Sequence, residues 1–257
     1  MLYLVRLFHK ISMGDFMKKG IFLSFNFKSF LSLTLVFIIV FFLVLSLNMA
    51  SVTTTSLLVD AGDVIIVDAG HGGEDGGTQS SVGVLEKDIN LDISLKLGNL
   101  LRLMGYTVVY TRSDDSLHYG SDAVKQRQKK VSDIHYRMQI MKSYPDSIFL
   151  SIHQNHFIES KYYGAQVFYS KNNSFSKTVA ESLQTNIRKL IQPENDRQIK
   201  PSGTDIYLLY NAESPAVMVE CGFLSNAGEA LRLSDSEYQK MLTLAIAAGI
   251  EELNSSR

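Results

Sequence analysis

The chain has 257 residues, of which 46% are hydrophobic and 20% are charged, a composition typical of a globular protein. Its net charge of −1 is unevenly distributed: residues 1–50 hold five basic residues and one acidic residue, which leaves 20 basic and 25 acidic residues in the remainder, a net of −5. A mildly acidic domain without a basic stripe is a poor nucleic-acid binder, so that class is excluded. The single cysteine, Cys221, excludes an internal disulfide and is expected to be a small buried residue.

A long apolar run lies near the N-terminus. Residues 29–47 carry no charge, and nineteen such residues are about enough for a helix to cross a bilayer. All basic residues of this part lie in residues 1–28, so the positive-inside rule predicts that the remainder of the chain is exported across the cytoplasmic membrane. We favour a membrane anchor. A cleaved signal peptide is the alternative, because residues 48–50 carry half of a small-x-small cleavage pattern. Met13 and Met17 are alternative start sites.

The remainder is predicted to be a Ser/Thr-containing linker at 48–62 and one folded domain at 63–257. In chain order, the expected elements are a strand at 64–67, a helix at 86–104, a strand at 106–111, a helix at 122–144, strands at 147–153 and 165–169, a helix at 175–191, a loop at 196–203, strands at 206–210 and 216–222, and a helix at 236–253. Strands that alternate with helices predict an α/β fold: an open, mostly parallel sheet with helices on both faces.

Three of the buried strands deliver chemically active side chains at their ends. The first runs into a glycine-rich turn that carries His71, the strand at 147–153 ends in His153, and the strand at 216–222 carries Glu220 before a glycine. A further carboxylate, Glu86, follows the first loop. Because ligands of open α/β sheets bind at the carboxyl ends of the strands, this recurrence predicts a functional site there.

Two imidazoles and one carboxylate form a ligand set typical of catalytic zinc, which leaves a coordination position for water. Such a site polarises a carbonyl oxygen and lowers the pKa of its water to about 7. A second carboxylate outside the metal can accept the water's proton and pass it to a leaving nitrogen. His71, Glu86 and His153 fit the ligand roles and Glu220 fits the base, although spacing alone leaves open which glutamate has which role.

Structural interpretations compete with this hypothesis. A lone histidine at a strand end is most often a structural group, and Glu86 is also explained as a first-turn carboxylate favoured by the helix dipole. Glu220 favours function, because a carboxylate in so apolar a strand is costly unless it is paired or bound to metal. His156 is an alternative ligand close to His153. The glycine-rich turn lacks the Gly-Lys-Ser/Thr of a nucleotide-binding loop, so phosphate binding is not expected.

Four motifs, in order, resemble those of the zinc-dependent N-acetylmuramoyl-L-alanine amidases of the amidase_3 type. They are Val67-Asp68-Ala69-Gly70-His71-Gly72-Gly73, Glu86, Ser151-Ile152-His153-x-Asn155, and Val219-Glu220-x-Gly222-Phe223-Leu224-Ser225-Asn226. The resemblance covers about residues 63–253. It implies one zinc per chain held by His71, Glu86 and His153, with Glu220 as the catalytic carboxylate. It also implies hydrolysis of the amide between N-acetylmuramic acid and L-Ala of the peptidoglycan stem peptide.

Two details refine this resemblance. Gln154 stands where the family usually has alanine, next to the expected metal, and is a candidate for tuning substrate choice. Residues 111–114, Thr-Arg-Ser-Asp, match a family element that is expected to be structural. Residues 200–205, and the combination of an N-terminal hydrophobic segment with no wall-binding repeats, are similar to the spore-cortex amidases of endospore formers. The alternatives are a catalytically silent peptidoglycan-binding protein on the same fold and, less favoured, a zinc peptidase or deacetylase.

Overall fold

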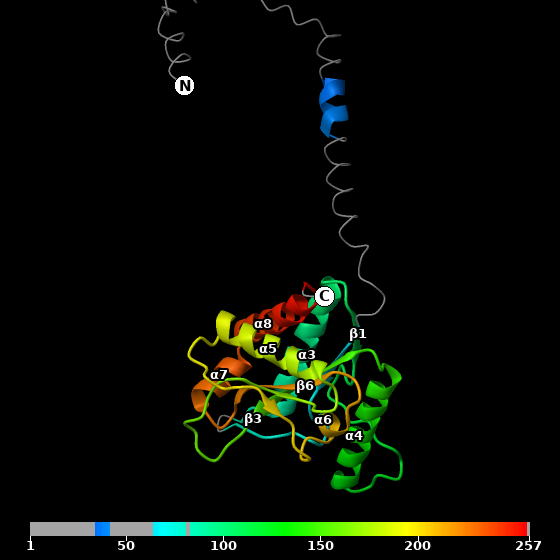
Figure 1. Cartoon of the computed structure of the whole chain (residues 1–257), viewed down its shortest axis with the longest axis vertical. Coiled ribbons are helices and arrows are strands. Elements are labelled where there is room, and N and C mark those ends of the chain that lie inside the picture. The colour runs from blue at the N-terminus through cyan, green and yellow to red at the C-terminus, as the bar shows by residue number, and fades with distance from the viewer. Residues whose placement is uncertain (1–33, 42–63, 81–82, 256–257) are drawn as a thin grey trace, which may run out of the picture. The chain divides into compact units, whose positions relative to one another are not determined.

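The computed structural model describes residues 34–41, 64–80 and 83–255 (Figure 1). Residues 34–41 form a short helix, and among the described residues no helix combines the length and the apolarity needed to cross a membrane. Most of the predicted hydrophobic segment at 29–47 and the linker at 48–62 lie outside the described residues. Both therefore stay predictions. The described residues from 64 onward belong to one compact unit.

A six-stranded sheet forms the centre of this unit, in the order β2-β1-β3-β6-β4-β5. The strands are β1 (Val64–Ala69), β2 (Thr107–Tyr110), β3 (Ile148–Asn155), β4 (Gln166–Tyr169), β5 (Lys200–Pro201) and β6 (Ala216–Phe223). Only the pairing of β4 with β6 is antiparallel, and the other neighbouring strands pair parallel. The prediction of a mostly parallel sheet is thus confirmed. β1, β3 and β6 are apolar runs because each is covered on both faces.

Helices cover both faces of the sheet (Figure 1). The larger layer holds α3 (Glu86–Leu103), α5 (Phe175–Leu190), α7 (Ala227–Ser234) and α8 (Ser236–Ser255), and the opposite face holds α4 (Gln126–Ser143) and α6 (Tyr207–Asn211). Side chains alternate across a strand, so Ile65 and Val67 pack into the larger core while Ile66 packs into the smaller one.

Two predicted elements differ from the structure. The segment expected to be a strand at 206–210 is the helix α6, whose consecutive Leu208 and Leu209 are both buried in the smaller core. Five residues are too few for apolar periodicity to separate strand from helix. The helix α7 was not predicted, although Asn226 caps it by accepting a hydrogen bond from the Glu229 N–H at 3.1 Å. The expected loop at 196–203 contains the short strand β5.

A buried charge network holds the carboxyl end of β1. The Asp68 carboxylate accepts hydrogen bonds from Arg137 Nη1 at 2.7 Å, Thr111 Oγ1 at 2.6 Å and Ser151 Oγ at 2.5 Å. Burial alone would raise the pKa of Asp68, but Arg137 and the two hydroxyls lower it below its usual range. The carboxylate is therefore ionised inside the protein.

The same arginine fixes the turn that follows β1. Arg137 donates to the carbonyl oxygens of Ala69 and His71, both at 2.7 Å, and Arg112 donates to those of Ala69 and Gly70 at 2.9 and 3.0 Å. His71 has a φ of +62°, which side-chain-bearing residues adopt rarely. The two guanidinium groups hold the backbone in this conformation.

Replacing Arg137 by Met should reduce the free energy of unfolding by about 3–5 kcal/mol, because it leaves the Asp68 carboxylate buried without its counter-ion. Urea titration followed by circular dichroism measures this. The control is Lys177→Met, which removes an exposed pair with Glu181 at 3.6 Å and should cost about 0–1 kcal/mol. Equal losses in the two variants would show that the Asp68 network does not stabilise the fold.

Candidate metal centre

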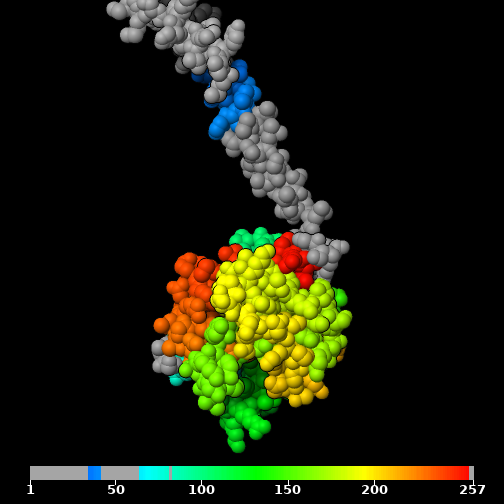
Figure 2. All heavy atoms as spheres, turned by 60° about the vertical axis from the view of Figure 1, so that its left-hand side comes forward, coloured from blue at the N-terminus to red at the C-terminus, as the bar shows by residue number. Residues whose placement is uncertain are grey.

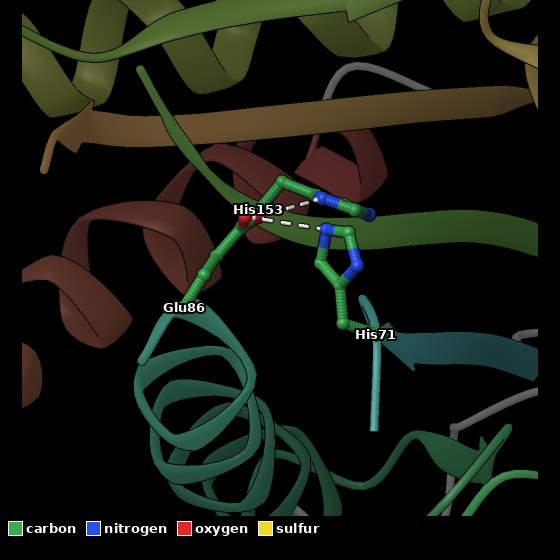
Figure 3. Close-up of side chains that lie close together, drawn as sticks. All are labelled: His71, Glu86 and His153. Carbon is green, nitrogen blue, oxygen red and sulfur yellow. Dashed lines mark hydrogen bonds and ion pairs between the residues drawn. The ribbon is translucent and has the colours of Figure 1, made fainter. Parts of the chain in front are cut away.

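Three of the four predicted side chains converge at the carboxyl end of the sheet (Figure 3). His71 follows β1, Glu86 opens α3, and His153 lies in β3. The Glu86 carboxylate lies 3.2 Å from His71 Nε2 and 3.0 Å from His153 Nδ1, and the two imidazole centroids are 5.0 Å apart. One candidate ligand atom from each residue lies within 4.8 Å of the other two.

Backbone and side-chain donors orient the Glu86 carboxylate. Its Oε2 accepts from the Thr78 N–H at 2.9 Å, and its Oε1 accepts from the Gln154 N–H at 3.1 Å and from Asn90 Nδ2 at 3.3 Å. Burial would raise the pKa of Glu86, but the hydrogen bonds and charges of the two histidines hold it far below its usual range. Glu86 is thus a buried, ionised carboxylate in a fixed position. A carboxylate placed only to interact with the helix dipole would not need these additional hydrogen bonds.

Asp75 supports His71 and was missed by the sequence analysis. Its Oδ2 lies 2.8 Å from His71 Nδ1 and 3.0 Å from Lys130 Nζ, so His71 turns Nε2 towards Glu86. Burial would lower the pKa of His71, but its hydrogen bonds to Asp75 and Glu86 raise it to about 9. A carboxylate on the outer nitrogen is the usual support of a metal-binding histidine. An acidic residue four positions after the histidine was the available sequence indication.

Glu220 lies beside this cluster. It pairs in register with His153 across β3 and β6. Its Oε2 is buried and has no hydrogen-bond partner among the described residues. Burial, together with the nearby Glu86 charge, raises the pKa of Glu220 to about 7, against the lowering effect of His153. Glu220 is the carboxylate of the site best suited to exchange a proton near neutral pH.

Two glycines make room for the cluster. A Cβ on Gly70 would overlap the imidazole of His153, and a Cβ on Gly77 would lie 2.5 Å from Glu86 Oε2 and 2.8 Å from the His71 ring. Gly77 also has a φ of +67°. The glycines of this turn therefore allow the side chains of His71, Glu86 and His153 to lie close to the backbone of the turn.

The remaining sequence candidates lie outside the cluster. The Gln154 side chain is buried and donates to Asn90 Oδ1 at 3.1 Å, and Asn90 donates to Glu86, so a role of Gln154 in tuning substrate choice stays a prediction. His156 is exposed and is not part of the histidine–glutamate cluster. Cys221 is fully buried, as expected, and burial raises the pKa of its thiol.

A cavity of about 190 Å³ opens beside the two histidines. Residues of α4, such as Lys130 and Arg137, form one wall, and residues around α6, such as Asp205 and Tyr207, form the other. Figure 2 shows the surface hollowed between these segments, α4 in dark green and α6 in gold. The site is thus reached from the face of the sheet that carries α4 and α6.

Comparison with known proteins identifies the family. A profile of the N-acetylmuramoyl-L-alanine amidase family Amidase_3 matches residues 65–252. The chain belongs to this family. The germination-specific N-acetylmuramoyl-L-alanine amidase of Bacillus subtilis (strain 168) is 31% identical over 190 residues, which cover 74% of this chain and 79% of that protein.

Solved structures agree with this assignment. The CwlD amidase from Clostridioides difficile, solved in complex with the GerS lipoprotein, is 42% identical with a TM-score of 0.73, covering 76% of this chain and 99% of that one. The catalytic domain of CwlV from Bacillus (Paenibacillus) polymyxa var. colistinus is 30% identical with a TM-score of 0.62, covering 76% and 99%. This chain is an N-acetylmuramoyl-L-alanine amidase acting on peptidoglycan, which favours an enzyme over a silent binding protein.

Replacing Gly70 by Ala should lower the amidase activity about 100-fold or more, because the new methyl group displaces the His153 imidazole and a misplacement of about 1 Å in an active site costs that much. Release of stem peptides from purified glycan strands measures the activity. Gly76→Ala is the matched control, because among the described residues its Cβ would meet Leu85 alone, at an ordinary contact distance of 3.5 Å. Full activity of Gly70→Ala would show that the position of the His153 imidazole does not depend on the absence of a side chain at residue 70.

Proposed function

We propose that this amidase is zinc-dependent, with His71, Glu86 and His153 as the metal ligands and one zinc per chain. The main support is the donor set itself: two imidazole nitrogens and a carboxylate within 4.8 Å, which is a set that catalytic zinc prefers. Asp75 on the outer nitrogen of His71 adds the support typical of such ligands.

Zinc bound here supplies a Lewis acid for the carbonyl of the scissile amide and for the attacking water. Glu220 is the general base: it accepts a proton from the attacking water and then transfers it to the departing nitrogen of L-Ala. A pKa raised to about 7 suits both halves of this exchange, because the carboxyl group is then readily deprotonated and reprotonated near neutral pH.

The environments of the two glutamates support this division of roles. Glu86 has both oxygens engaged by backbone N–H groups and faces both histidines, as a fixed ligand does. Glu220 Oε2 has no partner among the described residues and remains available for a proton.

Glu220→Gln should retain zinc and lower kcat about 10²- to 10⁴-fold with little change in KM, because the amide cannot accept the proton. Glu86→Gln should lose zinc, as should His71→Ala and His153→Ala. Zinc content by atomic absorption and turnover on the same preparations measure both effects. Zinc loss in Glu220→Gln together with full zinc in inactive Glu86→Gln would reverse the two assignments.

We further propose the spore cortex as the place of action. The support is the similarity to the germination-specific amidase of Bacillus subtilis and the resemblance of residues 200–205 to spore-cortex amidases. Digestion of purified cortex and vegetative peptidoglycan, with analysis of the products, tests this. Released stem peptides from cortex support the proposal. Released acetate would indicate a deacetylase, and a preference for vegetative wall would contradict the cortex assignment.

We also propose that residues 29–47 direct export, with the catalytic domain at 63–257 outside the cytoplasmic membrane. The support is the uncharged nineteen-residue run preceded by basic residues. Protease added to intact cells stripped of wall should therefore digest the catalytic domain, while a cytoplasmic marker protein in the same cells survives. Protection of the domain until the membrane is lysed would contradict export.

A further inference from the structure

Arg197 lies close to Glu220 on the same side of the sheet. Gln166 of β4 pairs directly with Glu220 of β6, so their side chains share a face. Gln166 Oε1 accepts a hydrogen bond from Arg197 Nη2 at 2.5 Å. The guanidinium carbon also lies 4.8 Å from the centroid of the Phe223 ring, three residues after Glu220.

The segment that carries Arg197 is firmly held. The Arg197 N–H donates to Asn195 Oδ1 at 3.0 Å, and the buried Asn195 donates to the Ala165 carbonyl oxygen at 2.8 Å. Gln166 is fixed in turn, because its Nε2 donates to the Gln198 carbonyl oxygen at 2.6 Å. Arg197 is thus a half-buried side chain in a defined position, unlike a solvated surface arginine.

The Arg197 guanidinium group is attracted by the charges of Glu229, Asp196 and Glu220 but forms no close ion pair with a described residue. Within the described part of the chain no carboxylate oxygen lies within 4.0 Å of the guanidinium group, and its buried Nε has no hydrogen-bond acceptor. Glu220 Oε2 also has no hydrogen-bond partner among the described residues. A fixed, half-buried guanidinium group with an unused N–H donor is costly unless it serves a further group, and its position on the Glu220 side of the sheet makes the substrate that group.

The geometry points to Arg197 as the residue that binds a carboxylate of the stem peptide, namely the free α-carboxylate of the γ-linked D-glutamate that follows L-Ala. This inference rests on the proposed function, with Glu220 at the scissile amide. The muramic acid side of that amide carries neutral acetamido and hydroxyl groups, and L-Ala has no free carboxylate. The first anion beyond the amide is therefore on the second residue, and a guanidinium group with unused N–H donors matches a carboxylate in charge and geometry.

The test uses two synthetic glycan fragments of equal length whose stem peptides differ only at this carboxyl group, which is free in one and amidated in the other. kcat and KM are measured for the unaltered enzyme, Arg197→Gln, Arg197→Lys and Arg232→Gln. Arg232 is the matched control, because it is also an arginine beside an aromatic ring, Tyr238, but it is exposed on α7. Zinc content and thermal melting of each variant establish that the site and the fold are intact.

The unaltered enzyme and Arg232→Gln should show a KM about 10- to 100-fold lower for the free carboxylate, the range expected of a charge-assisted hydrogen bond. Arg197→Gln should treat the two fragments within about twofold, with kcat changed less than about threefold. Arg197→Lys should keep part of the preference, since it retains the charge and loses the planar pair of donors.

Equal KM values of the unaltered enzyme for the two fragments would overturn the inference. So would an Arg197→Gln variant that keeps the preference and loses kcat equally on both, which would mean that Arg197 acts on Glu220. If neither fragment is cleaved although zinc is bound, the proposed function fails. In that case calorimetry on the free dipeptide L-Ala-γ-D-Glu and its amide tests carboxylate binding by Arg197 independently of cleavage. Equal affinities for the two dipeptides contradict the inference. A preference for the free carboxylate that is lost in Arg197→Gln supports it.

Discussion

The buried ion pair between Asp68 and Arg137 is the constraint on which the remaining site geometry depends. Asp68 is the penultimate residue of β1 and is fully buried, so its charge requires a counter-ion. Arg137 provides that charge from α4, and its other N–H groups hold the carbonyl oxygens of Ala69 and His71. The ion pair that neutralises the buried Asp68 carboxylate therefore also fixes the positive φ of His71. It holds α4, which forms one wall of the cavity, against the end of β1.

Strand register then determines which side chains meet. β1, β3 and β6 are parallel neighbours, and their carboxyl ends bring the His71 turn, His153 and Glu220 to one edge of the sheet. A shift of one residue between β3 and β6 would turn Glu220 to the opposite face, where it would meet the apolar core. Glu86 reaches the same edge because the helix after β1 begins over the end of that strand, and Gly70 and Gly77 leave the space that the imidazoles occupy.

Much of this arrangement could be predicted from the sequence because it is encoded locally. Long apolar strands that end in His71, His153 and Glu220 indicate both the parallel sheet and the edge where the residues gather. Asp75 and Arg197 were missed because their roles depend on contacts with His71 and Gln166 that no local pattern specifies. The helix α6 was misassigned as a strand because so short a segment shows no clear hydrophobic period. Its two leucines are buried by tertiary contacts in the smaller core, which the local sequence does not specify.

The two glutamates have the same side chain and lie at the same edge of the sheet, but their surroundings shift the pKa values of their carboxyl groups in opposite directions. Glu86 lies at a helix start among N–H donors and imidazoles, so its ionised form is stabilised and its pKa falls. Glu220 lies within β6, and its Oε2 meets no hydrogen-bond donor among the described residues, so burial favours the protonated form of its carboxyl group. An unpartnered buried carboxylate lowers stability, and so does the positive φ of His71. The fold tolerates both at the carboxyl edge of the sheet because the buried Asp68–Arg137 pair holds that edge and the strands behind it pack in an apolar core.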